Sequence, residues 1–250
     1  MSIYTNTGLV KHAEKALALN TKYMWGGVLR LIEKQYDMLI GMYGNKAGTG
    51  YTAERRNELK RLFGKGFYGV DCVGLIKSYY WSGRADGGTG SPKYGAAGYP
   101  DVNAGGMYAA AKVKGRIADM PETPGIILIS RKAENHVGIY IGSGDTIEST
   151  LGSRGDGVVR HKLDKTFWTD WFECPYIVYT DRAGKPFRVI VAGDRVTIKS
   201  TAKYYSGTTV AIPSYLKTKN SLYSVAGVFS GRALLKELFS WVDLNDLDKV

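Results

Sequence analysis

The sequence is poor in cysteine and histidine. Its 250 residues include two cysteines, Cys72 and Cys174, and three histidines, His12, His136 and His161. A small secreted protein that depends on disulfides would contain more cysteines, so that class is excluded. No His, Cys and Asp residues stand at the spacing of metal ligands, and the sequence therefore implies no metal and no cofactor.

A long apolar run is also missing. No stretch reaches the roughly 18 apolar residues that cross a bilayer, so membrane insertion is not expected. Residues 1–19 mix charged and apolar residues at helical spacing and lack the unbroken apolar segment of a signal peptide. We expect a first helix there, in a protein that is made in the cytoplasm and needs another route to leave it.

Acidic residues are few relative to basic ones. The chain has 34 Lys and Arg against 23 Asp and Glu, which gives a formal charge of +11 at pH 7. This surplus favours an anionic partner, either nucleic acid or an anionic cell-wall polymer, although a merely soluble basic protein would show it too. Dense Lys/Arg runs, zinc-finger spacing and RNA-binding aromatic motifs are absent, so nucleic acid is not the expected partner.

The pattern of apolar residues changes from helical to extended near residue 125. Helical spacing covers 9–19 and 29–42, and a charged helix over 52–63 and a second over 72–81 have plausible caps. Short apolar or alternating runs then predict strands at 125–129, 136–141, 145–149, 157–160 and 176–179. Helices followed by antiparallel strands make an α+β domain, with the helix over 72–81 packed on the sheet.

A second domain is expected after a segment rich in turn-forming residues at 181–186. Short, closely spaced strands are predicted beyond it, at 187–191, 195–200, 223–228, 233–238 and from Trp241. Strands of this kind indicate a small all-β barrel. We therefore predict two domains, over residues 1–182 and 187–250.

Cys72 is expected at the first turn of a helix, in the segment 69–75 (GVDCVGL), with Asp71 as the N-cap. There the helix dipole and unpaired backbone N–H groups stabilise a thiolate. Cys174 lies in an aromatic stretch and is better explained as a buried structural thiol. A disulfide between the two is the less favoured alternative, because it would consume the nucleophile.

His136 begins the strand segment 136–142 (HVGIYIG). Beside the thiol, it would take the thiol proton and later protonate a leaving amine. Glu148 follows across the turn at 142–144, where a hairpin brings it near the start of the His136 strand to orient the imidazole. Ser149 and Thr150 are weaker alternatives for that role. Each residue alone has an ordinary structural explanation, but their order along the chain favours a cysteine hydrolase.

These segments resemble the NlpC-type cell-wall cysteine peptidases of the NlpC/P60 superfamily, which have a papain-like fold. The resemblance covers about residues 8–180, and it is carried by DCVGL at 71–75, HVGIYIG at 136–142 and YMWGG at 23–27. It implies a papain-like peptidase domain with a catalytic triad and an amide bond of the peptidoglycan stem peptide as substrate.

The resemblance also assigns roles to individual residues. It implies that Cys72, His136 and Glu148 are catalytic, that the Tyr23 hydroxyl lies near the oxyanion, and that Asp71 contacts a substrate amine. The sequence departs from the family at Glu148, where His, Asn or Gln is usual. The family's serine after the cysteine is a valine here, and the stretch 28–70 is longer than usual.

The C-terminal segments 192–199 (AGDRVTIK) and 234–242 (LLKELFSWV) resemble the wall-binding module of phage endolysins, which is similar to a bacterial SH3-like barrel. Aromatic side chains of this region are candidates for stacking on sugars: Tyr204, Tyr205, Tyr215, Tyr223 and Trp241. Several of them are equally explained as core residues, and for Trp241 the core is favoured.

Together these features predict a two-domain peptidoglycan hydrolase, an endolysin released by lysis. The resemblance implies that it cuts the stem peptide after γ-D-glutamate. Its expected partners are peptidoglycan and anionic wall polymers. Two alternatives remain open. One is an N-acetylmuramoyl-L-alanine amidase on the same fold, and the other is a non-catalytic cell-wall-binding protein.

Overall fold

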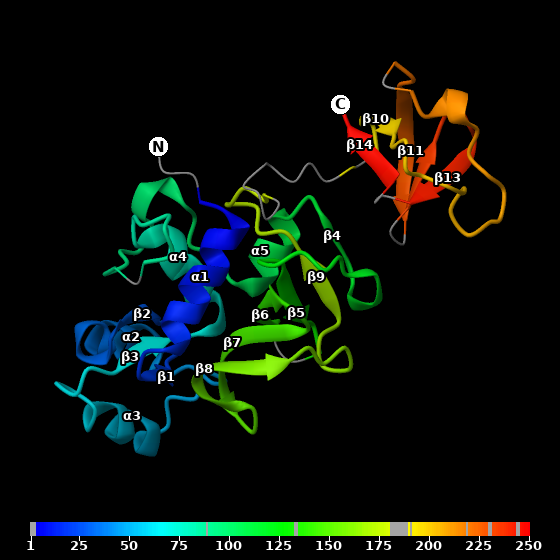
Figure 1. The fold of residues 1–250 in the computed structure, drawn as a ribbon. Helices are drawn as coiled ribbons and strands as arrows, with labels where there is room; N and C mark the ends of the chain where they lie inside the picture. The colour runs from blue at the N-terminus through cyan, green and yellow to red at the C-terminus, as the bar shows by residue number, and fades with distance from the viewer. Residues whose placement is uncertain are drawn as a thin grey trace. The chain divides into compact units, whose positions relative to one another are not determined.

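The computed structural model describes most of the chain, in two compact units over Met1–Pro186 and Phe187–Val250 (Figure 1). The described residues are 4–88, 90–132, 135–180, 190, 192–218, 220–229, 232–243 and 246–250. The boundary predicted at 181–186 lies outside them, as does the strand predicted at 187–191 apart from Ile190. No helix within the described residues is both long enough and apolar enough to cross a membrane.

Two helices pack against each other in the first unit. Helix α1 (Asn6–Leu17) begins after Thr5, and helix α4 (Cys72–Trp81) begins after Asp71. Each of these cap side chains accepts a hydrogen bond from an amide in the first turn, which satisfies a donor that the helix itself leaves unpaired. The structure thus confirms the first helix and the capped cysteine helix that the sequence predicts.

An antiparallel sheet of six strands supports these helices, in the order β4-β9-β5-β6-β7-β8. Its strands are β4 (Lys114–Arg116), β5 (Ile127–Ser130), β6 (His136–Gly142), β7 (Asp145–Gly152), β8 (Gly155–Lys162) and β9 (Asp170–Phe172). Strand β6 and strand β7 contact both α1 and α4. This arrangement confirms the mixed helix and sheet architecture.

Both faces of strand β5 are buried, as its continuous apolar sequence predicts. Ile127 and Ile129 belong to the core shared with α1 and α4. Leu128, together with Ile126 just before the strand, belongs to a second cluster on the opposite face, which includes Trp168. Side chains of a strand alternate between faces, so one apolar run supplies both clusters.

A smaller sheet precedes α4. It has the order β1-β3-β2, with β1 (Thr21–Tyr23), β2 (Val28–Leu31) and β3 (Tyr68–Val70). Between β2 and β3 the chain forms further helices: η1 (Ile32–Lys34), α2 (Tyr36–Tyr43) and α3 (Ala53–Lys60). The continuous helix predicted over 29–42 is therefore wrong at its start. Residues 28–31 pair with β3 instead, a long-range contact that overrides local helical spacing.

The strand predicted at 176–179 does not form. Val178 makes only an isolated bridge, to Thr5, and the sheet is extended instead by β9. Tyr179 is buried, with its hydroxyl between the amide of Cys174 and the carbonyl of Gly125. The chain here is held by side-chain and isolated backbone contacts rather than by a ladder.

The remaining helices of the first unit are α5 (Ala104–Ala110) and the 3-10 turns η2 (Ala96–Gly98) and η3 (Ile117–Asp119). They precede the strands β5 to β8 that carry two of the predicted site residues. Helix α5 begins after Asn103, whose side chain accepts a hydrogen bond from the amide of Gly106.

The second unit is an all-β region, as predicted, with the strand order β13-β12-β11-β10-β14. Its strands are β10 (Arg195–Ile198), β11 (Tyr223–Phe229), β12 (Arg232–Leu235), β13 (Ser240–Asp243) and β14 (Leu247–Lys249), and its short turn is η4 (Ser214–Leu216). All neighbouring pairs are antiparallel. No ladder in the described part of the chain joins β13 to β14, so closure into an SH3-like barrel stays a prediction.

Tyr223 and Trp241 of the second unit differ in how deeply they are buried. Tyr223 is buried in its core. Trp241 is only half-buried, and the guanidinium of Arg232 lies 5.5 Å from its ring centroid. The preference for Trp241 as a core residue is therefore wrong. Its neighbour Val242 takes the core position, and alternation along β13 turns the tryptophan to the other face.

Candidate active site

Cys72 lies at the N-terminus of α4 and lines a cavity of about 720 Å³. It is a free, partly buried thiol. One turn of the helix comes unusually close to the segment 23–27: a Cβ atom at Gly74 would lie 1.7 Å from the carbonyl oxygen of Gly27. Glycine is therefore required at position 74, and this close approach brings the 23–27 segment beside the cysteine.

His136 connects the thiol with the carboxylate of Glu148. Its Nε2 lies 2.5 Å from Oε2 of Glu148, and the side chain of Cys72 is near enough to the ring to raise its pKa. Because Nε2 faces the carboxylate, Nδ1 is the nitrogen left for the thiol. The ring stacks on Trp168, with centroids 5.7 Å apart and planes inclined by 15°. The structure thus brings together the three residues that the sequence singled out.

The environment of His136 favours its charged form. Burial is the largest influence on the His136 pKa and lowers it, but hydrogen bonds and charge attraction from Cys72 and Glu148 outweigh burial and raise the pKa to about 9. An imidazolium therefore persists at neutral pH. It is the partner that stabilises a thiolate.

Glu148 is fully buried, and its second oxygen is held by Arg154. Nε and Nη2 of Arg154 donate to Oε1 of Glu148 at 3.1 and 2.5 Å, and the guanidinium lies 4.1 Å from the ring centroid of Phe167. Burial raises the pKa of Glu148, but the hydrogen bonds from His136 and Arg154 outweigh it and lower the pKa below its usual value. The carboxylate is therefore ionised beside the imidazole.

Sequence reasoning missed Arg154. It lies in the two-residue turn between β7 and β8, flanked by Gly152 and Gly155, which are paired across the hairpin. Those glycines mark a tight turn, and this signal would have placed Arg154 opposite the strand that carries Glu148. Ser149, the weaker candidate for the third position, instead donates to the carbonyl of Val70 at 2.8 Å. Thr150, the other alternative, lines the cavity.

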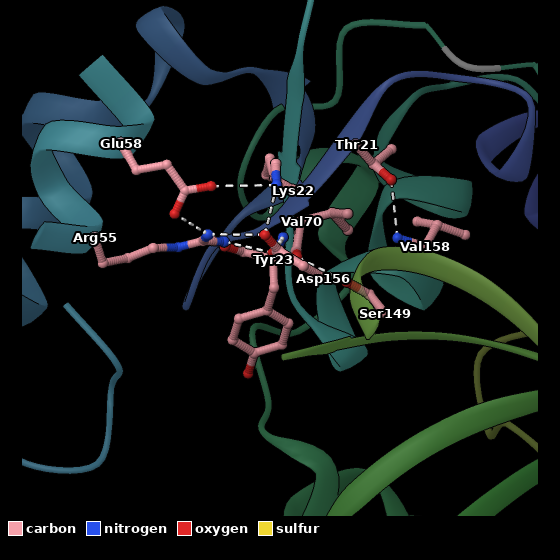
Figure 2. A network of polar contacts seen from close by, with 9 residues as sticks. All are labelled: Thr21, Lys22, Tyr23, Arg55, Glu58, Val70, Ser149, Asp156 and Val158. Carbon is pink, nitrogen blue, oxygen red and sulfur yellow. Dashed lines mark hydrogen bonds and ion pairs between the residues drawn. The ribbon is translucent and has the colours of Figure 1, made fainter. Parts of the chain in front are cut away.

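Tyr23 also lines the cavity, and its backbone is held from both sides. Its amide donates to Oδ1 of Asp156 at 3.0 Å, and its carbonyl accepts from Nη2 of Arg55 at 2.6 Å. Figure 2 shows the Tyr23 ring pointing away from these charged groups. The contacts with Asp156 and Arg55 therefore hold the main chain from which the ring projects.

Asp71 uses both carboxylate oxygens on backbone amides. Oδ1 accepts from Gly74 at 2.5 Å and Oδ2 accepts from Gly26 at 2.7 Å. Burial raises the pKa of the Asp71 carboxyl. The side chain thus joins the first turn of α4 to the 23–27 segment. Contact with a substrate amine remains a prediction from the resemblance.

The long stretch 28–70 contributes directly to the cavity, through Tyr43 and residues 48–50. Lys77 and Asp101 also line it and form an ion pair at 2.5 Å. The end of α2 and the loop after it therefore form part of the wall of the site.

The other histidines and the second cysteine have structural surroundings. His12 is buried, with Nδ1 3.1 Å from the carbonyl of Gly88 and Nε2 2.7 Å from the hydroxyl of Ser78. A carbonyl can only accept, so Nδ1 carries the proton, and burial lowers the His12 pKa to about 4. Burial raises the pKa of the Cys174 thiol to about 12, as expected of a structural cysteine. His161 lies 3.8 Å from Glu148.

Comparison with known proteins assigns most of the first unit to a protein family. A model of the NlpC/P60 family matches residues 20–175. Among solved structures, the chain is similar to the P60 domain of an antigen from M. avium subspecies paratuberculosis, with 18% identity over 68% of this chain and 97% of that one and a TM-score of 0.37. It is also similar to the peptidoglycan hydrolase RipB of Mycobacterium tuberculosis, with 18% identity over 67% of this chain and 66% of that one and a TM-score of 0.33. No curated protein matches the chain.

Proposed function

The chain belongs to the NlpC/P60 family over residues 20–175, and on that premise we propose that it hydrolyses an amide bond in the stem peptide of bacterial peptidoglycan. The observation that carries the proposal is the placement of one partly buried imidazole, His136, in contact with the Glu148 carboxylate and near enough to the Cys72 thiol to interact with it. This constellation opens into a cavity large enough for a peptide.

In the first half of the reaction the Cys72 thiolate attacks the carbonyl carbon of the scissile amide. The resulting oxyanion is stabilised by the backbone N–H of Cys72 and the hydroxyl of Tyr23. His136 donates its proton to the leaving nitrogen as the C–N bond breaks. An amine departs, and the acyl part of the substrate remains on Cys72 as a thioester.

In the second half water attacks the thioester. The imidazole of His136, now neutral, accepts a proton from that water, and Glu148 stabilises the imidazolium that forms. The C–S bond then breaks, which releases a carboxylic acid and restores the thiolate beside the imidazolium. Glu148 keeps the ring in one orientation throughout, because its Oε2 remains bound to Nε2.

The bond that we propose is the amide after γ-D-glutamate, and the biological role is that of an endolysin. The support is the likeness of DCVGL and HVGIYIG to the motifs of wall peptidases. The alternative amidase activity, at the bond between N-acetylmuramic acid and L-alanine, would use the same steps. The new termini distinguish them, since the endopeptidase leaves a free γ-D-glutamyl carboxyl and the amidase a free L-alanine amine.

The second unit is proposed to bind the cell wall as an SH3-like module. Tyr204 and Tyr215 support this role, because their side chains are 51% and 71% exposed in a unit that has its own buried core. Exposed tyrosines stack on sugar rings. We expect Tyr204→Ala and Tyr215→Ala to weaken binding of the full chain to purified walls. Val210→Ala, at an exposed aliphatic residue, is the control and should bind normally.

The net charge of +11 supports anionic wall polymers as additional partners. The proposal includes synthesis in the host cytoplasm and release onto the wall by lysis. Fractionation of cells before and after lysis tests this: the protein should be found in the cytoplasmic fraction first and on wall fragments afterwards.

The activity is tested by incubating purified walls of several Gram-positive bacteria with the wild type and with Cys72→Ala, followed by mass spectrometry of the released fragments. We expect the wild type alone to clear the walls and to create new peptide termini. Equal clearing by both proteins would exclude Cys72 as the nucleophile. Binding without any cleavage on all walls would favour the non-catalytic alternative.

A further inference from the structure

A compact group of charged side chains lies where the inserted helix α3 meets β1 and β8 (Figure 2). It consists of Lys22, Arg55, Glu58 and Asp156. Two of these residues, Arg55 and Glu58, come from α3. Arg55 is the more buried of the two, with 9% of its surface exposed. The group is separate from the catalytic triad and joins three segments that are distant in the sequence.

The central contact is a two-point interaction between Arg55 and Asp156. Nη2 of Arg55 lies 2.6 Å from Oδ1 of Asp156, and Nη1 lies 2.9 Å from Oδ2. Such a fork fixes direction as well as distance, which a lysine cannot do. Lys22 adds a further contact to Oδ2 at 2.7 Å, so the carboxylate is fully engaged.

The same two side chains also hold Tyr23. The Nη2 atom that contacts Asp156 also donates to the Tyr23 carbonyl, and the Oδ1 atom that contacts Arg55 also accepts from the Tyr23 amide. The main chain of one residue is therefore fixed on both sides by one ion pair. Ladder bonds to β3 hold the strand as a whole, whereas this pair acts on the single residue whose ring lines the cavity.

We propose that the Arg55–Asp156 pair is a positioning device, supplied in part by the 28–70 insertion, that orients Tyr23 toward the reaction centre. This inference rests on the proposed function, in which the Tyr23 hydroxyl stabilises the oxyanion. Neither Arg55 nor Asp156 is a catalytic residue, because they act through the backbone of Tyr23. The long insertion thus completes the site as well as enlarging its wall.

The test is a double-mutant cycle between Asp156→Asn and Tyr23→Phe in the full chain. If the pair acts through Tyr23, Asp156→Asn should lower kcat for wall hydrolysis by about tenfold in the wild-type background and by less than about threefold in Tyr23→Phe. KM should change less than kcat. Arg55→Lys, which keeps the charge but loses the fork, should show a smaller loss of the same kind.

A second readout separates positioning from general damage. Alkylation of Cys72 by iodoacetamide forms no oxyanion, so its rate should stay within about twofold of wild type in Asp156→Asn. The exposed residues Asp37 and Arg61 supply matched controls: Asp37→Asn and Arg61→Lys should change neither hydrolysis nor alkylation. If Asp156→Asn does not fold, the same cycle is run with Arg55→Lys.

Three results would overturn the positioning role: full activity of Asp156→Asn, an equal loss in both Tyr23 backgrounds, or alkylation that falls in parallel with hydrolysis. These require an active wild type and leave the proposed function intact. A wild type that alkylates at Cys72 but cleaves no wall would instead overturn the proposed function, and the role of the pair with it.

Discussion

Arg154 and Glu148 form a charged pair in which Nη2 lies 2.5 Å from Oε1, behind the imidazole that the same carboxylate orients. Glu148 is completely buried, so its negative charge depends on this neighbour and on His136 for compensation. The Cys72 thiol and the His136 imidazole line the cavity, and behind them Glu148 and Arg154 form a second layer of charge.

Replacing Arg154 with Ala should destabilise the fold and reduce activity. The change leaves Glu148 with only one charged partner close enough for a strong contact, and removing one member of a buried pair costs about 3 kcal/mol in the free energy of unfolding. Urea unfolding measures this loss. Arg154→Lys keeps the charge and should lose less, whereas equal stability of wild type and Arg154→Ala would contradict the structure.

The pH dependence of hydrolysis should depend on Glu148. The raised His136 pKa means that the imidazolium persists at neutral pH and is lost as the pH rises through about 9. Activity that needs thiolate and imidazolium should fall over the same range. Glu148→Gln removes the negative charge, so the alkaline limb of kcat/KM should move to lower pH. An unchanged limb would show that another group controls it.

The same ionisation affects stability in a defined direction. A histidine whose pKa is raised from 6.5 to about 9 on folding contributes stability that is fully present below pH 6.5 and is lost as the pH rises through 9. NMR titration of the His136 ring would give its folded pKa directly. That value should be lower in Glu148→Gln.

His12 should make the fold sensitive to acid, in the opposite sense. Its pKa is lowered from 6.5 to about 4, so the unfolded chain binds a proton more readily and stability declines as the pH falls through this interval. The contribution amounts to about 3 kcal/mol at most. Urea unfolding between pH 7 and pH 4 measures it. His12→Gln should show a shallower decline, and an identical slope would contradict the assignment.

Gly74→Ala should be far more disruptive than an alanine at another helical glycine. The added Cβ would meet the carbonyl oxygen of Gly27 at 1.7 Å, so the 23–27 segment would have to move, at a cost of about 3 kcal/mol. Gly41 in α2 is the matched control, because nothing lies within 4 Å of its added Cβ. Gly41→Ala should stabilise the helix by up to about 1 kcal/mol. Thermal unfolding of both variants decides the matter.

The site residues that could be predicted lie in pairs close to one another in the sequence, where caps, turns and strand alternation determine their positions. Asp71 and Cys72 form a cap and a first turn, and both are adjacent in the sequence. Glu148 follows His136 within one hairpin, so strand alternation and a short glycine-rich turn were enough to bring them together. The order of these elements along the chain then made the three-residue arrangement recognisable.

The parts that were missed depend on distant pairing. Strand β2 pairs with β3 across the whole insertion, and its helical spacing gave the wrong local structure. The contact between Arg55 and Asp156 joins residues that are 101 positions apart, and no pattern in either segment indicates the other. In the second unit, the core position expected for Trp241 is occupied by its neighbour Val242, because a strand of four residues offers little periodicity from which to assign its faces.

The hairpin of β7 and β8 carries Arg154 in its two-residue turn and Asp156 near the start of β8, two residues apart in the chain. Arg154 supports the Glu148 carboxylate behind the His136 imidazole, and Asp156 holds the main chain of Tyr23. One hairpin therefore supports two residues that line the cavity, His136 through Glu148 and Tyr23 through its main chain. An added residue there would shift the register of Asp156 and displace both supports together. For protein engineering, the length of this hairpin and the identities of Arg154 and Asp156 should be kept, whereas the loop at 46–50 is the place to vary the groove.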